Sequence, residues 1–269
     1  MSVLLQLFLA YTLILLLATF SYKEKLAQER EIFITSIRCA IQLLILGYTL
    51  RYIFSLRAWY WLILILGVMT CAAAFIGAER LKLKASRIFL VKVCFLSLFL
   101  STSIVFFPLL ALGVIKATFR EVLTLWGLVL GQAVNSLNLA QERLASEAIN
   151  RKDEIEAKVA LGATLKEALK DCIKNAISAS LIPKYNSLKA VGIVFIPGIT
   201  AGMIIAGADP LKAIVYQILV MYLILGVSLF CAYFILHLTY PLVFSSLQSR
   251  TNLFKKKRRR RDSNPRREE

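Results

Sequence analysis

The chain has 269 residues, of which 58% are hydrophobic and only 18% are charged, and its mean hydropathy is +0.70. Soluble domains are about 45–50% apolar and about 25% charged, so this composition argues against a soluble enzyme. It also argues against a disordered chain, which needs few apolar residues. The net charge of +17 would suit a nucleic-acid binder, unless the position of the charges explains it otherwise.

Seven apolar segments are long enough to cross a bilayer as helices, which takes about 20 residues. The first follows only two residues and carries its basic residues after it, so we predict a retained helix rather than a cleaved signal peptide. The expected fold is all-α and polytopic, with a membrane domain over residues 1–245 and a basic, disordered tail over residues 246–269. The predicted spans are residues 3–20, 32–50, 58–78, 88–112, 122–140, 188–208 and 213–238.

The basic residues gather in alternate loops. Of the 33, three lie in residues 21–31, four in 79–87, nine in 141–189 and ten from Arg250 onward, against five in the other loops. Basic loops stay on the cytoplasmic side of a membrane protein, so we predict seven spans with the N-terminus outside and the C-terminus inside. The protein is expected in the plasma (inner) membrane. The run KKKRRRR near the C-terminus is expected to contact anionic lipid of the bilayer rather than nucleic acid.

One predicted cytoplasmic segment, about residues 143–184, is unusually long. Its apolar residues recur at spacings of three and four, which indicates amphipathic helices. Gly162 divides the pattern, and Thr164 followed by Glu167 is typical of a capping box at the start of a second helix. The segment is therefore predicted to form a helical element between the fifth and sixth spans, and loops of this kind are usually functional.

Within this segment Glu156-Ala157 is followed by Gly162-Ala163, in the pattern E-A-x-x-x-x-G-A. The pattern resembles the coupling loop of ABC-transporter membrane subunits, in which a short helix ends at the glycine and docks on a cytoplasmic ATPase. Small side chains permit close approach, and glycine permits the sharp turn. The residues that the resemblance implies for ATPase coupling are Glu156, Ala157, Leu161, Gly162, Ala163 and Thr164.

A longer series of residues, in order over about residues 20–240, resembles the FetB-type iron-export permeases. It includes Lys23-Glu24-Lys25-Leu26, Arg38, Gln42-Leu43, Gly47-Tyr48, Leu161-Gly162-Ala163-Thr164, Leu181-Ile182-Pro183, Val191-Gly192, Pro197-Gly198 and Tyr216-Gln217-Ile218. The resemblance implies the permease subunit of an ABC transporter that exports iron or another metal ion. It also implies a partner ATPase subunit, expected in two copies, on a homodimer of this chain.

The chain has no Walker A sequence, so we expect ATP to be used by the partner subunit, and we expect neither enzyme activity nor a cofactor here. No residue is assigned as a metal ligand. The one histidine, His237, and the five scattered cysteines do not form the cluster of soft ligands that a transition-metal site needs.

Polar residues within the predicted spans are the candidates for a transport path. A charge at mid-membrane costs about 2.5–3.5 kcal/mol on insertion scales, which favours a function for Arg38, such as holding an anionic chelate. Amides in spans can equally join helices by hydrogen bonds, and small residues can pack them closely. The candidates are Arg38, Gln42, Gln132, Asn135, Pro197, Gly198 and Gln217.

Two other classes of membrane protein fit seven spans. An ion-coupled secondary transporter of a small solute usually places its coupling site near the bilayer midplane, where we would expect a titratable carboxylate, whereas Asp209 lies only at the outer end of the sixth predicted span. A retinal pump needs a lysine in the middle of the seventh span, whereas Lys212 lies at its edge. We keep the secondary transporter as the alternative.

Overall fold

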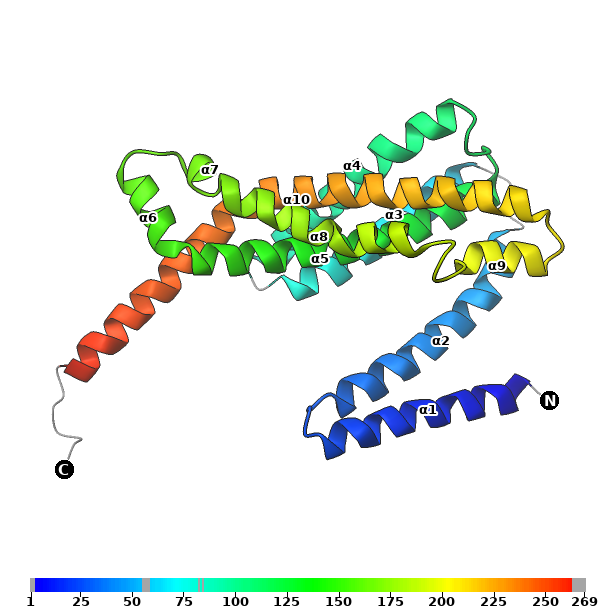
Figure 1. The fold of residues 1–269 in the computed structure, drawn as a ribbon, viewed down its shortest axis with the longest axis horizontal. Helices are drawn as coiled ribbons and strands as arrows, with labels where there is room; N and C mark the ends of the chain where they lie inside the picture. Colours follow the sequence, from blue (N-terminus) through cyan, green and yellow to red (C-terminus); the bar gives the residue numbers. More distant parts are fainter. Residues whose placement is uncertain (1–2, 55–58, 82, 84, 263–269) are drawn as a thin grey trace. The chain divides into compact units, whose positions relative to one another are not determined.

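The computed structural model describes the backbone of residues 3–54, 59–81, 83 and 85–262, and the side-chain surroundings of the part from residue 9 to residue 244. The described residues form helices joined by turns, with one isolated bridge between Val191 and Phe195 (Figure 1). The predicted all-α class is therefore confirmed. The chain divides into two units, residues 1–58 and 59–269, which we describe separately.

The first unit is a hairpin of two helices, α1 (Val3–Lys23) and α2 (Glu29–Ile53). Ser21 is buried at the turn, where its hydroxyl donates to the Glu29 carboxylate at 3.1 Å. The predicted first two spans correspond to these helices, and α2 extends a few residues beyond the predicted 32–50 at both ends.

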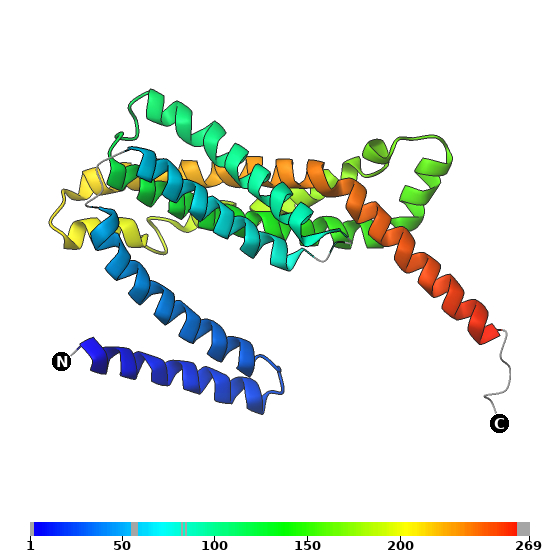
Figure 2. The same ribbon diagram turned by 180° about the vertical axis from the view of Figure 1, so that it is seen from behind.

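In the second unit, α5 is the central helix, packed against four others (Figures 1 and 2). Its apolar residues recur at helical spacing over a long stretch, and the exposed polar residues of its second half lie on the opposite side. The long helices of this unit are α3 (Trp59–Arg80), α4 (Arg87–Ala111), α5 (Phe119–Asn150) and α10 (Pro210–Asp262).

Two buried polar contacts join these helices. The Trp126 indole of α5 packs edge-on against Phe106 of α4, with ring centroids 5.5 Å apart, and donates to the Thr70 hydroxyl of α3 at 3.2 Å. Further along α5, the Gln141 amide donates to the Thr239 hydroxyl of α10. Both contacts fix the rotation of one helix against its neighbour, because a buried donor needs its acceptor.

Between α5 and α10 the chain forms four shorter helices: α6 (Lys152–Ala160), α7 (Leu165–Ala168), α8 (Lys170–Ala190) and α9 (Gly198–Ile205). The predicted span over residues 188–208 does not form one continuous helix. It is interrupted at residues 191–197, where Gly192 has φ +79° and Pro197 lacks an N–H group. Residues 188–208 therefore supply only the end of α8, the interruption and α9.

The helix α8 runs antiparallel to α5. Asn175 of α8 donates to Glu147 of α5 at 3.3 Å. The second contact joins Lys184, nine positions later on α8, to Gln132, fifteen positions earlier on α5; the Lys184 ammonium group donates to the Gln132 amide oxygen. The projecting part of the predicted 143–184 element is therefore shorter than expected. It consists of α6, α7 and the turn between them, while the rest belongs to α5 and α8.

Five helices of the described residues are long and apolar enough to cross a membrane, namely Glu29–Ile53, Trp59–Arg80, Arg87–Ala111, Phe119–Asn150 and Pro210–Phe244. Leu9–Lys23 is a shorter apolar helix. The count of seven spans and the orientation stay predictions, as do the permease-domain and tail bounds. The backbone of α10 includes residues 246–262 of the predicted tail, and residues 263–269 lie outside the described part.

Candidate functional site

The turn after α6 is built by its glycine. Gly162 has φ +94°, a left-handed conformation that favours glycine, and a Cβ placed there would meet no atom within 4 Å. The Gly162 N–H donates to the Val159 carbonyl, and the Ala163 N–H to the Lys158 carbonyl, both at 3.0 Å. This pair of bonds is the Schellman motif, which ends a helix by satisfying its last carbonyls. Gly162 therefore sets the direction of the chain at this point.

The predicted capping box at the start of α7 is confirmed. The Glu167 N–H donates to the Thr164 hydroxyl at 3.3 Å, and the Thr164 N–H donates to the Glu167 carboxylate at 2.8 Å. The Thr164 hydroxyl also donates to this carboxylate, at 2.7 Å. These bonds favour the ionised form of Glu167 and lower the pKa of its carboxyl group from the ordinary 4.5.

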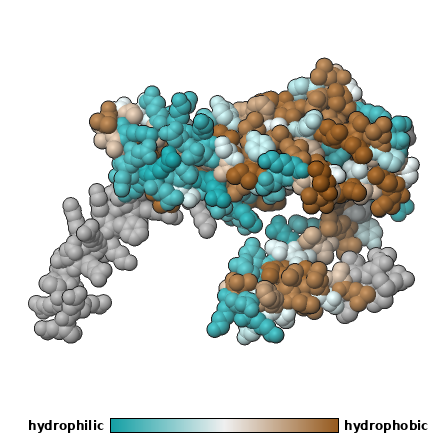
Figure 3. Space-filling model, in the orientation of Figure 1, coloured by the Kyte–Doolittle hydropathy of each residue, from teal (hydrophilic) through white to brown (hydrophobic). Residues whose placement is uncertain are grey.

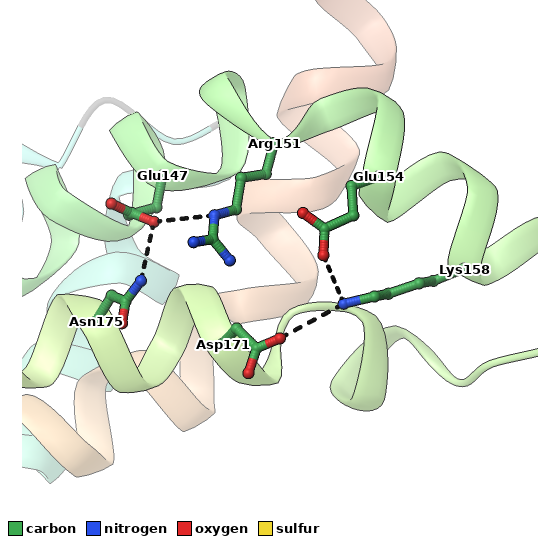
Figure 4. Close-up of polar contacts among 6 residues, drawn as sticks. All are labelled: Glu147, Arg151, Glu154, Lys158, Asp171 and Asn175. Atoms are coloured by element: carbon green, nitrogen blue, oxygen red, sulfur yellow. Dashed lines mark hydrogen bonds and ion pairs between the residues drawn. The ribbon is translucent and has the colours of Figure 1, made fainter.

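A chain of charges ties α6 back to α8. The Lys158 ammonium group lies 2.8 Å from the Glu154 carboxylate and 3.5 Å from that of Asp171, the second residue of α8 (Figure 4). Its hydrogen bond and charge lower the pKa of Glu154, and the two carboxylates together raise the pKa of Lys158. The side chain of Ile155, a residue of α6, is buried. The short helix is thus held at a defined position relative to the bundle.

A second pair of contacts lies beside the first (Figure 4). The Glu147 carboxylate at the end of α5 lies 3.5 Å from the Arg151 guanidinium and accepts from Asn175 of α8 at 3.3 Å. Glu147 therefore joins the two long helices at the point where α6 begins.

The outer end of this element is exposed and mixed in character. Leu161 is 90% exposed, and the small side chains Ala157 and Ala160 are exposed beside it. Among the described residues, the ion pair of Glu156 is with Lys152 of its own helix, at 3.6 Å. The structure thus brings the six predicted coupling residues together around one turn, with Ala163 half-buried and the others exposed. In Figure 3 the element is hydrophilic with a small hydrophobic area at its outer end.

The transport-path candidates of the second unit fall into two neighbouring groups. Gln132 and Asn135 lie one turn apart on α5, and Gln132 accepts from Lys184 of α8. Lys184 was not predicted, because it was counted in a cytoplasmic loop. The spacing of apolar residues predicted helices up to residue 184, but it gave no signal that this helix packs against α5.

The second group surrounds a cavity of about 520 Å³ between the end of α8, the interruption, α9 and α10. Pro197 and Gln217 line it, and Gly198 begins α9 next to it. The walls are mainly apolar, but the buried Thr200 hydroxyl donates to the buried Gln217 amide oxygen at 3.4 Å. Thr200 was not predicted, since a threonine within an apolar segment carries no distinctive signal.

The other two candidates, Arg38 and Gln42, lie in the first unit, one turn apart on α2, and both are exposed there. Their role in a path stays a prediction. Within the described residues, no group of three or more histidine, cysteine or acidic side chains is placed to hold a metal ion.

These helices define a multi-pass membrane protein. The chain belongs to the uncharacterised protein family UPF0014, which matches residues 4–244, so the resemblance found in the sequence is confirmed. No solved structure matches the chain.

Three relatives illustrate the family. The probable iron export permease protein FetB of Escherichia coli is 34% identical over 238 residues, which is 88% of this chain and 91% of the relative. The membrane protein YjkA of Bacillus subtilis is 32% identical over 90% of this chain and 94% of its own. The protein ALUMINUM SENSITIVE 3 of Arabidopsis thaliana is 30% identical over 91% and 89%. The first two names describe a permease and a membrane protein.

Proposed function

We propose that this chain is the membrane subunit of an ABC transporter and that a separate ATPase docks on the α6–α7 element. The observation that carries the proposal is the construction of this element: a short helix closed by Gly162, with the exposed Leu161 at its end. Burial of Leu161 against a docked ATPase would be favourable, because it removes apolar surface from water.

The contacts beneath the element suggest how movement would be transmitted. Lys158 connects α6 to α8, and Glu147 connects α5 to α8 where α6 begins. When ATP draws two ATPase subunits together, a shift of α6 would act on both helices at once. We propose two copies of this chain around a two-fold axis, with α5 and α8 changing the access to the transported species.

For the cargo we propose export of iron or another metal. The support is the name of the FetB relative, with the name of ALUMINUM SENSITIVE 3 pointing to metals more widely. The corresponding location is the plasma or inner membrane. Cellular metal content in a deletion strain under iron stress tests this part, and an unchanged content would contradict it.

A charge at the exposed leucine tests the docking. In Leu161→Glu, the amount of a Walker-motif ATPase that co-purifies with the chain should fall by about tenfold or more, since the apolar contact is replaced by a buried charge. Leu112→Glu is the matched control, because Leu112 is a 75% exposed leucine in the turn after α4. Equal ATPase recovery with both variants, or no ATPase with the natural chain, would contradict the proposal. Transport without ATP would instead favour an ion-coupled transporter.

A further inference from the structure

The contact between α5 and α8 places a positive charge inside the helix bundle. Gln132 lies at the middle of the predicted fifth span, residues 122–140, and its amide oxygen accepts from the Lys184 ammonium group. Lys184 is therefore at the same depth as Gln132. A lysine near the end of a span extends its amine toward the headgroups, whereas this amine donates to an amide of the neighbouring helix.

No ion pair among the described residues includes Lys184. A neutral amide satisfies one of the three N–H groups of an ammonium and leaves its charge uncompensated. Ionisable groups at membrane depth usually face the interior of a bundle or a water-filled path, and they mark the route of a substrate or ion. The half-buried Lys184 fits this description.

The lysine is also adjacent to the cavity. Leu188, one turn further on α8, and Val191, the residue that follows the end of α8, both line it. Residues at these spacings share one face of a helix, so Lys184 continues the row of side chains that forms the α8 wall. At the other end of the cavity, Gln217 gives its amide oxygen to Thr200 and keeps its N–H groups as donors. The Lys184 ammonium group and the Gln217 amide therefore both carry N–H donors near the cavity.

We propose that Lys184, with Gln132 and the adjoining cavity, binds anionic oxygens of the cargo. This inference rests on the proposed transport function and narrows its substrate class. The transported species would be an anion bearing carboxylate or phosphate groups, either free or coordinating a metal, because a bare metal cation is repelled by a fixed ammonium group. Charge-assisted hydrogen bonds from lysine are among the stronger contacts available to such oxygens.

Equilibrium binding to the purified full chain in lipid nanodiscs tests the proposal without an ATPase. The probes are ferric citrate, citrate alone and ferrous ion alone. We expect ferric citrate to bind, and Lys184→Gln to weaken it by about tenfold or more while Lys184→Arg retains it. Lys189→Gln is the matched control, because Lys189 is exposed on a different face of α8. Binding of citrate alone identifies the free anion as a ligand, and its absence identifies the metal complex.

A second variant keeps the test valid if Lys184→Gln fails to fold. Gln132→Glu preserves the side-chain volume and pairs the lysine with a carboxylate, so it should abolish binding of the same probe. Binding of ferrous ion alone, or ferric citrate binding that survives both Lys184→Gln and Gln132→Glu, would overturn the inference. Loss of ATPase association leaves these measurements unaffected, so failure of the proposed docking is distinguishable.

Discussion

Individual polar residues decide how the apolar helices of the second unit are fixed. Thr70 donates to the Leu66 carbonyl of its own helix and accepts from the Trp126 indole. Thr102, equally buried on α4, has no hydrogen-bond partner for its hydroxyl among the described residues. The two threonines are equally buried, but only the Thr70 hydroxyl makes a hydrogen bond to a neighbouring helix among the described residues.

This difference predicts that replacing each threonine by valine changes the stability of the protein differently. Thr70→Val leaves the buried indole N–H without an acceptor and should destabilise the protein by about 1 kcal/mol, within the range measured for hydrogen bonds in membrane proteins. The free energy of unfolding by SDS in mixed micelles, followed by tryptophan fluorescence, measures it. Thr102→Val is the control and should be neutral or slightly stabilising. If Thr102→Val destabilised the protein as much as Thr70→Val, the assignment of the Trp126 contact would be wrong.

At this scale the sequence predicted the polar candidates but not their partners. Gln132 stands out because an amide in an apolar segment needs a partner, yet nothing in the sequence shows that the partner is Lys184. That pairing depends on the antiparallel register of α5 and α8, which the turn at Gly162 and the lengths of α6 and α7 determine. Gln132 and Lys184 are 52 positions apart, so their contact results from the packing of two helices. The local spacing of residues in the sequence does not predict it.

At the scale of elements, the α6–α7 turn shows what local signals can predict. The helix end at Gly162 and the cap at Thr164 are short-range features, determined by residues within five positions of each other. Residues 188–208 show the opposite case. Their composition suits a membrane helix, but the helix is interrupted at residues 191–197, where Gly192 and Pro197 lie, and the mean hydropathy of the segment does not give these bounds.

The turn element has a predictable response to pH. The pKa values of Glu154 and Glu167 are lowered by their contacts, so these contacts stabilise the element above the ordinary 4.5 and are lost as pH falls through the lowered pKa values. The raised pKa of Lys158 means that its contribution persists until pH rises above 10.5. Hydrogen exchange of residues 152–168, corrected for intrinsic rates, should therefore be constant from about pH 5.5 to pH 9.

Below about pH 4 the same amides should lose protection. Glu167→Gln is the matched control, since glutamine can also complete a capping box but does not titrate. It should retain protection at neutral pH and respond less to acid. Loss of protection already at pH 6, or an acid response that Glu167→Gln leaves unchanged, would show that these carboxylates do not hold the turn.

For the whole molecule, the number of crossings depends on the interrupted segment. The antiparallel register places the second half of α8 alongside the predicted span of α5, so the return path consists of α8, the interruption and α9. The charge count treated Lys184 and Lys189 as loop residues, but both lie on α8. The basic residues of the tail and of the α6–α7 region still give the asymmetry that predicts the orientation.

Three single cysteines, in a variant without the native five, test this topology. Lys116→Cys follows α4, Lys166→Cys lies in α7, and Asp209→Cys lies between α9 and α10; all three side chains are exposed. If α8, the interruption and α9 together cross the bilayer, an impermeant maleimide should label residues 116 and 209 in intact cells. Residue 166 should be labelled only in inverted vesicles, because seven crossings place the α6–α7 element beside the cytoplasmic ATPase. If residues 209 and 166 were labelled under the same condition, the interrupted segment would enter and leave the bilayer on the same side. The orientation itself is wrong if residue 166 reacts in intact cells and residue 116 does not.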